Sequence, residues 1–213
     1  MNFKKNRLIL CAAGVWWLLM IGTGVSYLKN YESNAGAAAA APERWPDGSR
    51  LRRAGDRATL IMLAHPHCPC TRASIGELSR LMTQAKGRLR AFVLFVKPPN
   101  VGDGWEQTDL LTSAAAIPGV TVVSDDAGVE AGRFRAVTSG QTVLYDTEGR
   151  LLFRGGITSA RGHAGDNAGR TAIVSLVTTG ETRQKETPVF GCPLLAQTEC
   201  PAGKEGGREK DNY

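Results

Sequence analysis

The chain has 213 residues, 42% of them hydrophobic, and this composition fits one medium-sized folded domain with extensions rather than a disordered or collagen-like chain. Its net charge is +6, but the basic residues are scattered and only 7% of the residues are aromatic. A nucleic-acid-binding surface normally combines a basic stripe with stacking aromatics, so we expect no nucleic-acid partner.

A long apolar segment follows the basic N-terminus. Residues 8–28 carry no charge, and their number is close to the roughly 20 residues that a helix needs to cross a membrane. A cleavable signal peptide is the alternative, but its apolar region usually spans only about 7–15 residues. We therefore expect a transmembrane helix that anchors the chain in the cytoplasmic membrane.

The charges before this helix predict its orientation. Lys4, Lys5 and Arg7 should keep the N-terminus in the cytoplasm. The rest of the chain is then predicted to lie in the periplasm of a bacterium, and the protein to be a single-pass protein of the inner membrane. Cysteine pairs can oxidise to disulfides in that compartment.

Composition divides the chain into four regions. Residues 1–30 form the cytoplasmic head and the anchor, and residues 31–50 resemble a polar, alanine-rich linker. Residues 51–180 carry the regular hydrophobic patterns of a folded domain. Residues 181–213 are predicted to form a cysteine-containing, partly disordered tail, because they become polar, charged and glycine-rich.

Hydrophobic patterns predict alternating strands and helices within residues 51–180. Continuous or alternating apolar runs indicate strands, and a period of 3.6 residues indicates helices. Strands are predicted in 58–65, 88–99 and 120–126, helices in 71–87, 105–119, 128–134 and 167–180, and a hairpin in 140–156. The early strands should be parallel and the hairpin antiparallel. The fold class is therefore predicted as α/β, a mixed sheet with helices on both faces.

Two cysteines lie where the first strand ends and the first long helix begins. Cys68 and Cys70 belong to the sequence HPHCPC, residues 65–70. The unpaired N–H groups at a helix start carry partial positive charge, which stabilises an anion such as a thiolate. Cysteines at such positions have lowered pKa values and raised reactivity. We therefore expect redox or metal chemistry from this pair.

Four neighbouring residues are expected to support the cysteine pair. Pro69 fixes one backbone angle between the two sulfurs and has no N–H to lose. Arg72 adds a positive charge in the first turn of the predicted helix. Positive charge on His65 and His67 would lower the pKa of a nearby thiol.

These features resemble the thioredoxin-like family. The resemblance rests on the anchor, the buried strand, the cysteine pair with its proline, the helix that carries Arg72 and Glu77, and the closing hairpin YDTEGRLLFRGG. It extends over about residues 45–178 and is closest to the membrane-anchored periplasmic thiol–disulfide branch of the family. The segments HPHCPCTRASIGEL, LYDTEGRLLFRGGIT and RGHAGDNAGR are most similar to the RedB group.

The resemblance implies a thioredoxin-like sheet and a thiol–disulfide oxidoreductase that needs no cofactor. Its partners would be protein thiols or disulfides in the periplasm. Cys68 would attack and Cys70 would resolve the mixed disulfide. The family has two residues between its cysteines, whereas this chain has one, so the sequence leaves open which cysteine attacks. Gln141 stands where the family has a cis-proline beside the cysteines.

Copper binding is the main alternative function. Sco-type relatives bind copper through two cysteines and a distant histidine, which implies Cys68, Cys70 and His163 as ligands here. Cys68 and Cys70 with His65 or His67 would also combine sulfur and imidazole ligands, which suit Cu(I) or Zn. A third alternative is a binding module that keeps the fold without catalysis.

The tail contains two further cysteines. Cys192 and Cys200 are close in sequence, so a local structural disulfide is expected between them in an oxidising compartment. The alternative is a tail pair that exchanges electrons with Cys68 and Cys70. The substrate, the direction of electron flow and the oligomeric state are not predicted.

Overall fold

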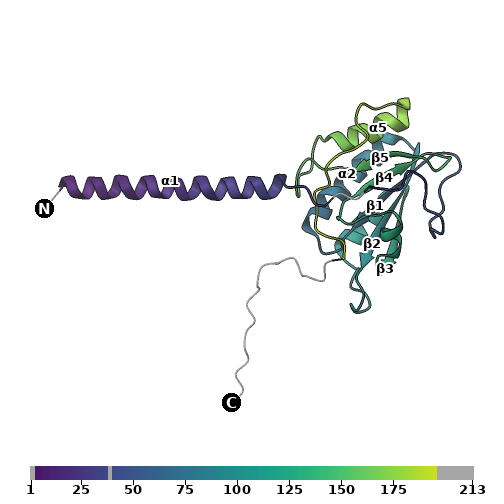
Figure 1. Cartoon of the computed structure of the whole chain (residues 1–213), viewed down its shortest axis with the longest axis horizontal. Coiled ribbons are helices and arrows are strands. Elements are labelled where there is room, and N and C mark those ends of the chain that lie inside the picture. Colours follow the sequence, from purple (N-terminus) through teal and green to yellow (C-terminus); the bar gives the residue numbers. More distant parts are fainter. Residues whose placement is uncertain (1–2, 38–39, 196–213) are drawn as a thin grey trace, which may run out of the picture. The chain divides into compact units, whose positions relative to one another are not determined.

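The computed structural model describes residues 3–37 and 40–195. The chain divides into two compact units, Met1–Asn34 and Ala35–Tyr213 (Figure 1). The first is a helical unit and the second contains the sheet.

The first unit is the helix α1, Phe3–Ser33. Its part from Asn6 to Ser33 is long and apolar enough to cross a membrane, and a signal sequence would share these properties. Large hydrophobic side chains such as Leu8, Trp16 and Leu19 are exposed along it, so the helix offers an apolar surface to its surroundings. The predicted helix over residues 8–28 is confirmed.

The second unit is built on one five-stranded sheet with the order β3-β2-β1-β4-β5. The strands β1, β2 and β3 are parallel, whereas β4 is antiparallel to β1 and β5 is antiparallel to β4. Their bounds are Ala58–Ala64 (β1), Leu89–Lys97 (β2), Val120–Asp126 (β3), Thr142–Tyr145 (β4) and Leu151–Gly155 (β5). The predicted mixed sheet is confirmed, with the cysteine-bearing junction following its central strand.

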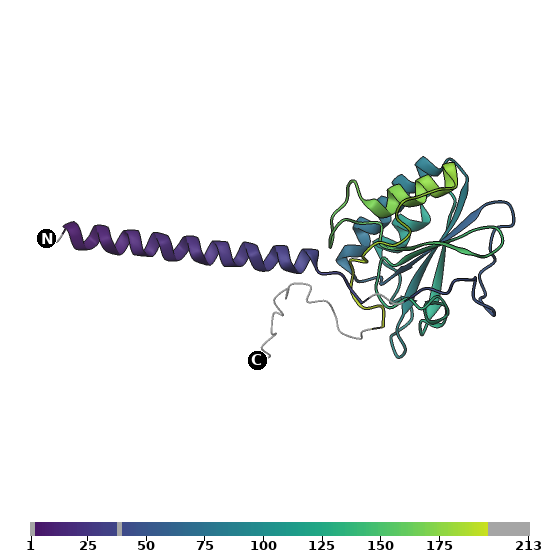
Figure 2. The same cartoon turned by 45° about the horizontal axis from the view of Figure 1, so that its top comes forward.

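Helices cover both faces of the sheet. The helices α2 (Pro69–Ala85), α3 (Asp109–Ala115) and α5 (Ala168–Thr179) bury their apolar sides on one face. Figure 2 shows α2 and α5 side by side on that face. The short helix α4 (Val129–Arg133) packs against the opposite face through Ala131.

The segment before β1 completes the opposite face. The Trp45 ring meets the rings of Phe134 and Tyr145 edge to face, with centroids 5.3 and 5.4 Å apart. The Tyr145 hydroxyl donates a hydrogen bond to the Pro42 carbonyl at 2.9 Å, and Leu51 is buried. The folded unit begins at Ala35, so it includes most of residues 31–50, which the sequence analysis placed in a linker.

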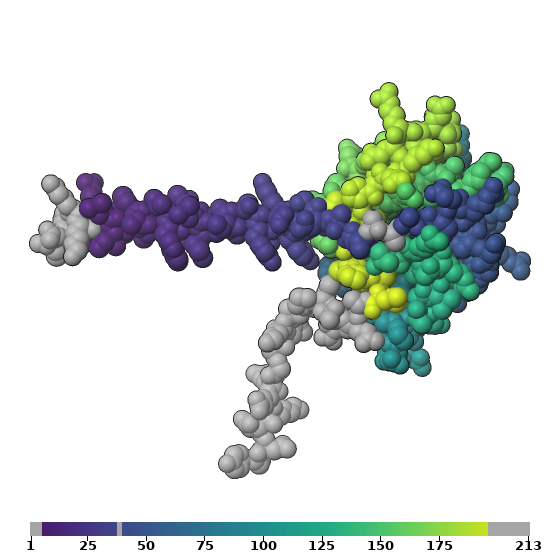
Figure 3. All heavy atoms as spheres, in the orientation of Figure 1, coloured from purple at the N-terminus to yellow at the C-terminus, as the bar shows by residue number. Residues whose placement is uncertain are grey.

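The chain also stays folded beyond the predicted domain end at residue 180. Val189, Phe190 and Leu194 are buried, and Thr138 forms an antiparallel bridge with Pro193. Figure 3 shows the yellow atoms of this stretch on the surface of the folded unit. The predicted disorder of the last residues, and Cys200 with it, lies outside the described residues.

Candidate functional site

Cys68 is the residue that caps the start of α2. Its backbone is extended, with φ −87° and ψ 118°, and its carbonyl accepts a hydrogen bond from Thr71 N–H at 3.0 Å. Pro69 occupies the first helical position, where its missing N–H removes no helical hydrogen bond. The Cys68 side chain therefore lies beside the positive end of a 17-residue helix. Cys68 is only 1% exposed.

Three sulfur atoms meet at this helix start. Cys68 Sγ lies 3.0 Å from Cys192 Sγ, in hydrogen-bonding contact. Hydrogen bonds from the Cys192 thiol and then from the Cys70 thiol hold the pKa of Cys68 well below its ordinary value, against the opposing effect of burial. The hydrogen bond to Cys68, together with burial, raises the pKa of Cys70. The cluster therefore favours a thiolate on Cys68 and a protonated thiol on Cys70.

Backbone pairing positions Cys192. The Cys192 carbonyl accepts a hydrogen bond from Ser139 N–H at 2.8 Å, and Leu194 N–H donates to the Val137 carbonyl at 2.9 Å. Between these two bonds lies the Thr138–Pro193 bridge. We call residues 191–194 the docked segment, because they pair like a short antiparallel strand with the loop before β4.

Gln141 supports this loop from behind. It is buried, its side-chain oxygen accepts from Val137 N–H at 3.3 Å, and its amide donates to the Arg135 carbonyl at 3.5 Å. No cis peptide bond occurs in residues 3–37 and 40–195. The position where the resembled family has its cis-proline thus holds a side chain that shapes the loop.

A hydroxyl pair joins the cysteine loop to the loop before β4. Ser139 Oγ accepts a hydrogen bond from His65 N–H at 2.9 Å and contacts Thr71 Oγ1 at 2.8 Å. The Thr71 hydroxyl also donates to the His65 carbonyl at 3.1 Å. All three residues are buried, so these bonds hold the start of α2 against the edge that binds the docked segment. The sequence analysis did not select Thr71 or Ser139.

The two histidines of the cluster differ in environment. His65 is buried against Trp105, with ring centroids 5.3 Å apart, and burial lowers its pKa. His67 is exposed, and its Nε2 contacts the Trp105 carbonyl at 2.9 Å. His65 is therefore favoured in its neutral form, which opposes its expected role as a positive charge beside the cysteines.

Arg161 is a site residue that the sequence analysis missed. It donates from Nη1 to the Gly191 carbonyl at 2.7 Å. Its hydrogen bond and charge also lower the pKa of Cys70, although less than Cys68 and burial raise it. By contrast, Arg72 pairs with Asp109 of α3 at 2.6 Å, with both side chains 65% exposed. The sequence feature that could have indicated Arg161 is a basic residue in the loop that carries His163.

A buried carboxylate holds the loop of Arg161. Glu77 of α2 is completely buried and forms ion pairs with Arg170 at 3.0 Å and Arg80 at 2.6 Å. It also accepts hydrogen bonds from Gly165 N–H at 2.8 Å and from the Asn167 amide at 3.1 Å. Residues 161–167 are thereby tied to the helix that begins at the cysteines.

The histidine proposed as a metal ligand lies on the same loop. His163 is exposed, and its Nδ1 contacts the Arg161 carbonyl at 3.0 Å. Within the described part of the chain, no group of three or more His, Cys, Asp or Glu side chains is arranged to hold a metal ion. The structure thus does not bring Cys68, Cys70 and His163 together as such a group, and the copper alternative stays a prediction.

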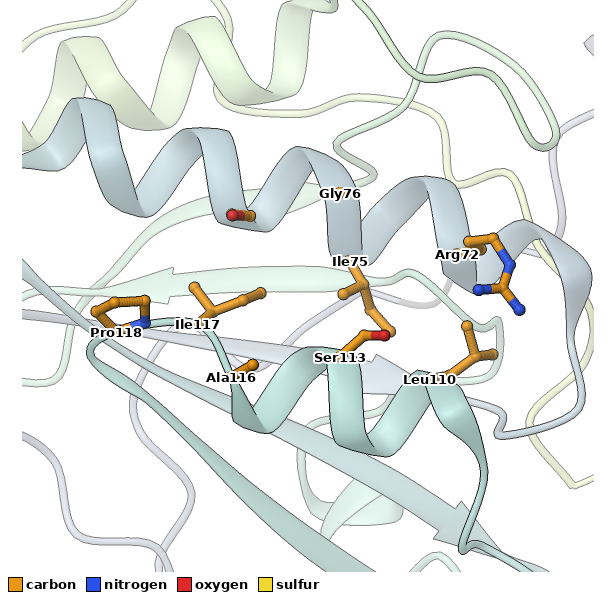
Figure 4. A pocket seen from close by; sticks show the side chains of 9 residues that line it. Arg72, Ile75, Gly76, Leu110, Ser113, Ala116, Ile117 and Pro118 are labelled. Atoms are coloured by element: carbon orange, nitrogen blue, oxygen red, sulfur yellow. The ribbon is translucent and has the colours of Figure 1, made fainter.

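A cavity of about 360 Å³ lies elsewhere, between α2 and the α3 region. Figure 4 shows Ile75 and Ser113 projecting into the space between the two helices, with Arg72 at one end. Its lining consists of Arg72, Ile75, Gly76, Ser79, Leu110, Ser113, Ala116, Ile117 and Pro118. Cys68, Cys70 and Cys192 do not line this cavity, so their chemistry is separate from it.

Several solved structures have a fold similar to that of this chain. A hypothetical protein from Sinorhizobium meliloti superposes with a TM-score of 0.57 at 17% identity, covering 78% of this chain and 100% of that one. An uncharacterized conserved protein from Geobacillus kaustophilus gives 0.56 at 18% identity, covering 78% and 93%. A β-α-β unit and a β-β-α unit share one sheet here, and Cys68 caps the helix after the central strand. The fold is thioredoxin-like.

Other solved structures are similar over a smaller part of the chain. A secreted disulfide oxidoreductase of Mycobacterium tuberculosis matches with a TM-score of 0.41 at 14% identity, covering 58% of this chain and 82% of that one. No family model and no curated protein matches the sequence. The thioredoxin-like resemblance is thus supported at the level of the fold, whereas the narrower resemblance to the RedB group stays a prediction.

Proposed function

We propose that this thioredoxin-like chain is a membrane-anchored thiol–disulfide oxidoreductase with Cys68 as the attacking thiol. The observation that carries this proposal is the sulfur of Cys68 at the start of α2, hydrogen-bonded by two further thiols. A thiolate, not a thiol, is the nucleophile in disulfide exchange, and a helix start is where proteins stabilise it.

The reaction balances with the residues present. The Cys68 thiolate attacks one sulfur of a partner disulfide, whose S–S bond breaks, and the released partner sulfur takes up a proton. A second thiolate of this chain then attacks Cys68 Sγ and releases the other partner thiol. The partner gains two electrons and two protons, and this chain ends with one disulfide. The reverse reaction has the same balance.

The helix α1 supports a location at the membrane. We infer that it crosses the bacterial inner membrane with the N-terminus in the cytoplasm, which places the cysteines in the oxidising periplasm. The partners are then protein thiols or disulfides of that compartment. A reporter fused after Tyr213 that requires export should be active, and a cytoplasm-active fusion would contradict this location.

The thiolate on Cys68 is tested by alkylation of the reduced full-length chain in detergent. Iodoacetamide labelling is followed against pH by mass spectrometry, in the wild type and in Cys70→Ser, which leaves one cysteine in the peptide 58–72. The pH at half-maximal rate should lie well below the free-cysteine value of about 8.5. The pH dependence is the readout, because burial slows labelling at every pH. Half-maximal labelling at or above the free-cysteine value would contradict the proposal.

A redox titration separates this function from copper binding. In glutathione buffers the wild type should interconvert between a dithiol and a disulfide state, and His163→Ala should keep the same midpoint because no sulfur is lost. Tight Cu(I) binding that disappears with His163→Ala, measured against a chromogenic chelator, would favour metal delivery instead. The absence of any reversible disulfide would exclude the oxidoreductase.

A further inference from the structure

We propose that Cys192, rather than Cys70, closes the disulfide with Cys68 when the chain is oxidised. This proposal rests on the thiol–disulfide function proposed above and names its second cysteine. It also assigns a role to the docked segment, which carries Cys192 to the start of α2.

The sulfur geometry favours this pair. Cys68 Sγ and Cys192 Sγ are 3.0 Å apart, so an approach of about 1 Å would bring them to the S–S bond length of about 2.05 Å. Cys70 is separated from Cys68 by Pro69 alone, and a disulfide between them would close a very small, tight ring. A strained disulfide is the more easily reduced of two alternatives, so oxidation should favour the longer connection.

The backbone around Cys192 holds it in position on both sides. Hydrogen bonds join Cys192 to Ser139 and Leu194 to Val137, and these surround the bridge of Pro193. A peptide that pairs with an exposed strand edge gains its affinity from such main-chain bonds. The docked segment therefore binds its own chain as an extended peptide would, with a cysteine placed opposite the attacking sulfur.

Gly191 allows the docked segment to lie close to the backbone of the loop before β4. A Cβ atom at this position would lie 1.9 Å from the Ser139 carbonyl oxygen, so no larger residue fits without displacement of the segment. Arg161 adds a charged hydrogen bond to the Gly191 carbonyl at 2.7 Å. With the segment docked, Cys68 is only 1% exposed, so a partner disulfide reaches it only when the segment moves aside.

The proposed cycle follows from these contacts. The docked segment leaves, and the Cys68 thiolate attacks a partner disulfide to form a mixed disulfide and release one partner thiol. The segment returns, and the Cys192 thiol, after losing its proton, attacks Cys68 Sγ. The Cys68–Cys192 disulfide forms, the Cys68–partner bond breaks, and the second partner sulfur takes up a proton.

Tryptic peptides distinguish the possible disulfides in the full-length chain. Cys68 and Cys70 lie on one peptide, 58–72, and Cys192 and Cys200 lie on another, 186–204. A Cys68–Cys192 disulfide links the two peptides, whereas Cys68–Cys70 and Cys192–Cys200 disulfides do not. The protein in detergent is oxidised with glutathione disulfide, quenched in acid, alkylated, digested and analysed by mass spectrometry. We expect the linked pair 58–72 with 186–204, with fragment ions that place the bond on Cys68 and Cys192.

Variants identify the two bonded sulfurs. Cys70→Ser and the matched tail control Cys200→Ser should both keep the linked peptides. Cys192→Ser should abolish them and lower the equilibrium constant for oxidation of Cys68 by glutathione by about 10-fold or more, a shift of about 30 mV for a two-electron couple. The wild-type measurement needs no substitution, so misfolding of a variant does not affect it.

The outcomes separate this proposal from the proposed function. A reversible Cys68–Cys70 disulfide without linked peptides would overturn the role of Cys192 and leave the oxidoreductase intact. Linked peptides joined through Cys200, or lost in Cys200→Ser, would also overturn it. A chain in which Cys68 forms no reversible disulfide would overturn both.

Discussion

Cys192 Sγ lies 3.0 Å from Cys68 Sγ, although the two cysteines are 124 positions apart in the sequence. The contact is made because the chain continues past α5 and pairs, through the docked segment, with the loop before β4. Because Cys192 lies opposite the start of α2, its contact with Cys68 affects both the packing of the docked segment and the redox chemistry of Cys68.

Oxidation should stabilise the fold if this pair forms a disulfide. A cross-link that closes a loop of about 100 residues is expected to add about 4–5 kcal/mol in the chain-entropy model. Urea unfolding of the oxidised and reduced full-length chain measures the difference. Equal midpoints would argue against a long-range disulfide, and Cys192→Ser provides the control in which oxidation should have little effect.

Gly191→Ala should release the docked segment. The added Cβ would meet the Ser139 carbonyl oxygen at 1.9 Å, and relief of such a clash costs about 1–3 kcal/mol. Iodoacetamide labelling of Cys68 should therefore accelerate by about 10-fold or more. Gly102→Ala is the matched control, because a Cβ there meets nothing within 4 Å. Equal labelling of both variants would show that the segment does not shield Cys68.

Arg161→Gln should loosen the same segment from its other side. The substitution removes the charged hydrogen bond to the Gly191 carbonyl, and a loss of about 1.5 kcal/mol corresponds to about a 10-fold increase in Cys68 labelling. Arg72→Gln is the control, because Arg72 pairs with Asp109 at the surface. If Arg72→Gln has the larger effect, the original assignment of Arg72 as the supporting charge is the better one.

Because His65 is buried, we expect the free energy of unfolding to decrease in acid. Burial lowers the pKa of His65 below the unfolded value of about 6.5, so the unfolded chain binds a proton first as the pH falls. The free energy of unfolding should therefore decrease below about pH 6.5, with no contribution from His65 above it. Urea titrations between about pH 5 and 7.5 measure this, with His163→Gln as the exposed control. If the free energy of unfolding of His65→Gln fell with pH as steeply as that of the wild type, His65 would not be the cause of the decrease.

Glu77→Ala should strongly destabilise the chain. The substitution leaves the Arg170 side chain, which is 10% exposed, without the carboxylate 3.0 Å away, and removal of one partner of a buried pair costs about 3–5 kcal/mol. Glu148→Ala removes a partner of Arg150 at an exposed pair and should cost about 0–1 kcal/mol. Similar urea midpoints for the two variants would mean that the Glu77 network contributes little.

The elements of the sheet domain and the position of Cys68 at a helix start were predictable from the sequence. Strand and helix patterns are local, because side chains alternate along a strand and repeat every 3.6 residues along a helix. The start of α2 is also local, since Pro69 and the end of an apolar run mark it within a few residues. These signals placed the cysteine pair at a helix start.

The groups that contact Cys68 could not be predicted in this way, because folding brings them together. Ser139, Arg161 and Cys192 come from loops whose positions depend on the strand order and on the packing of Glu77 against the loop after β5. Cys192 illustrates the same limit: no local pattern indicates that backbone pairing with the loop before β4 brings it to Cys68, and the expected Cys192–Cys200 disulfide stays a prediction because Cys200 lies outside the described residues. A contact between distant residues is created by folding, and local periodicity carries no information about it.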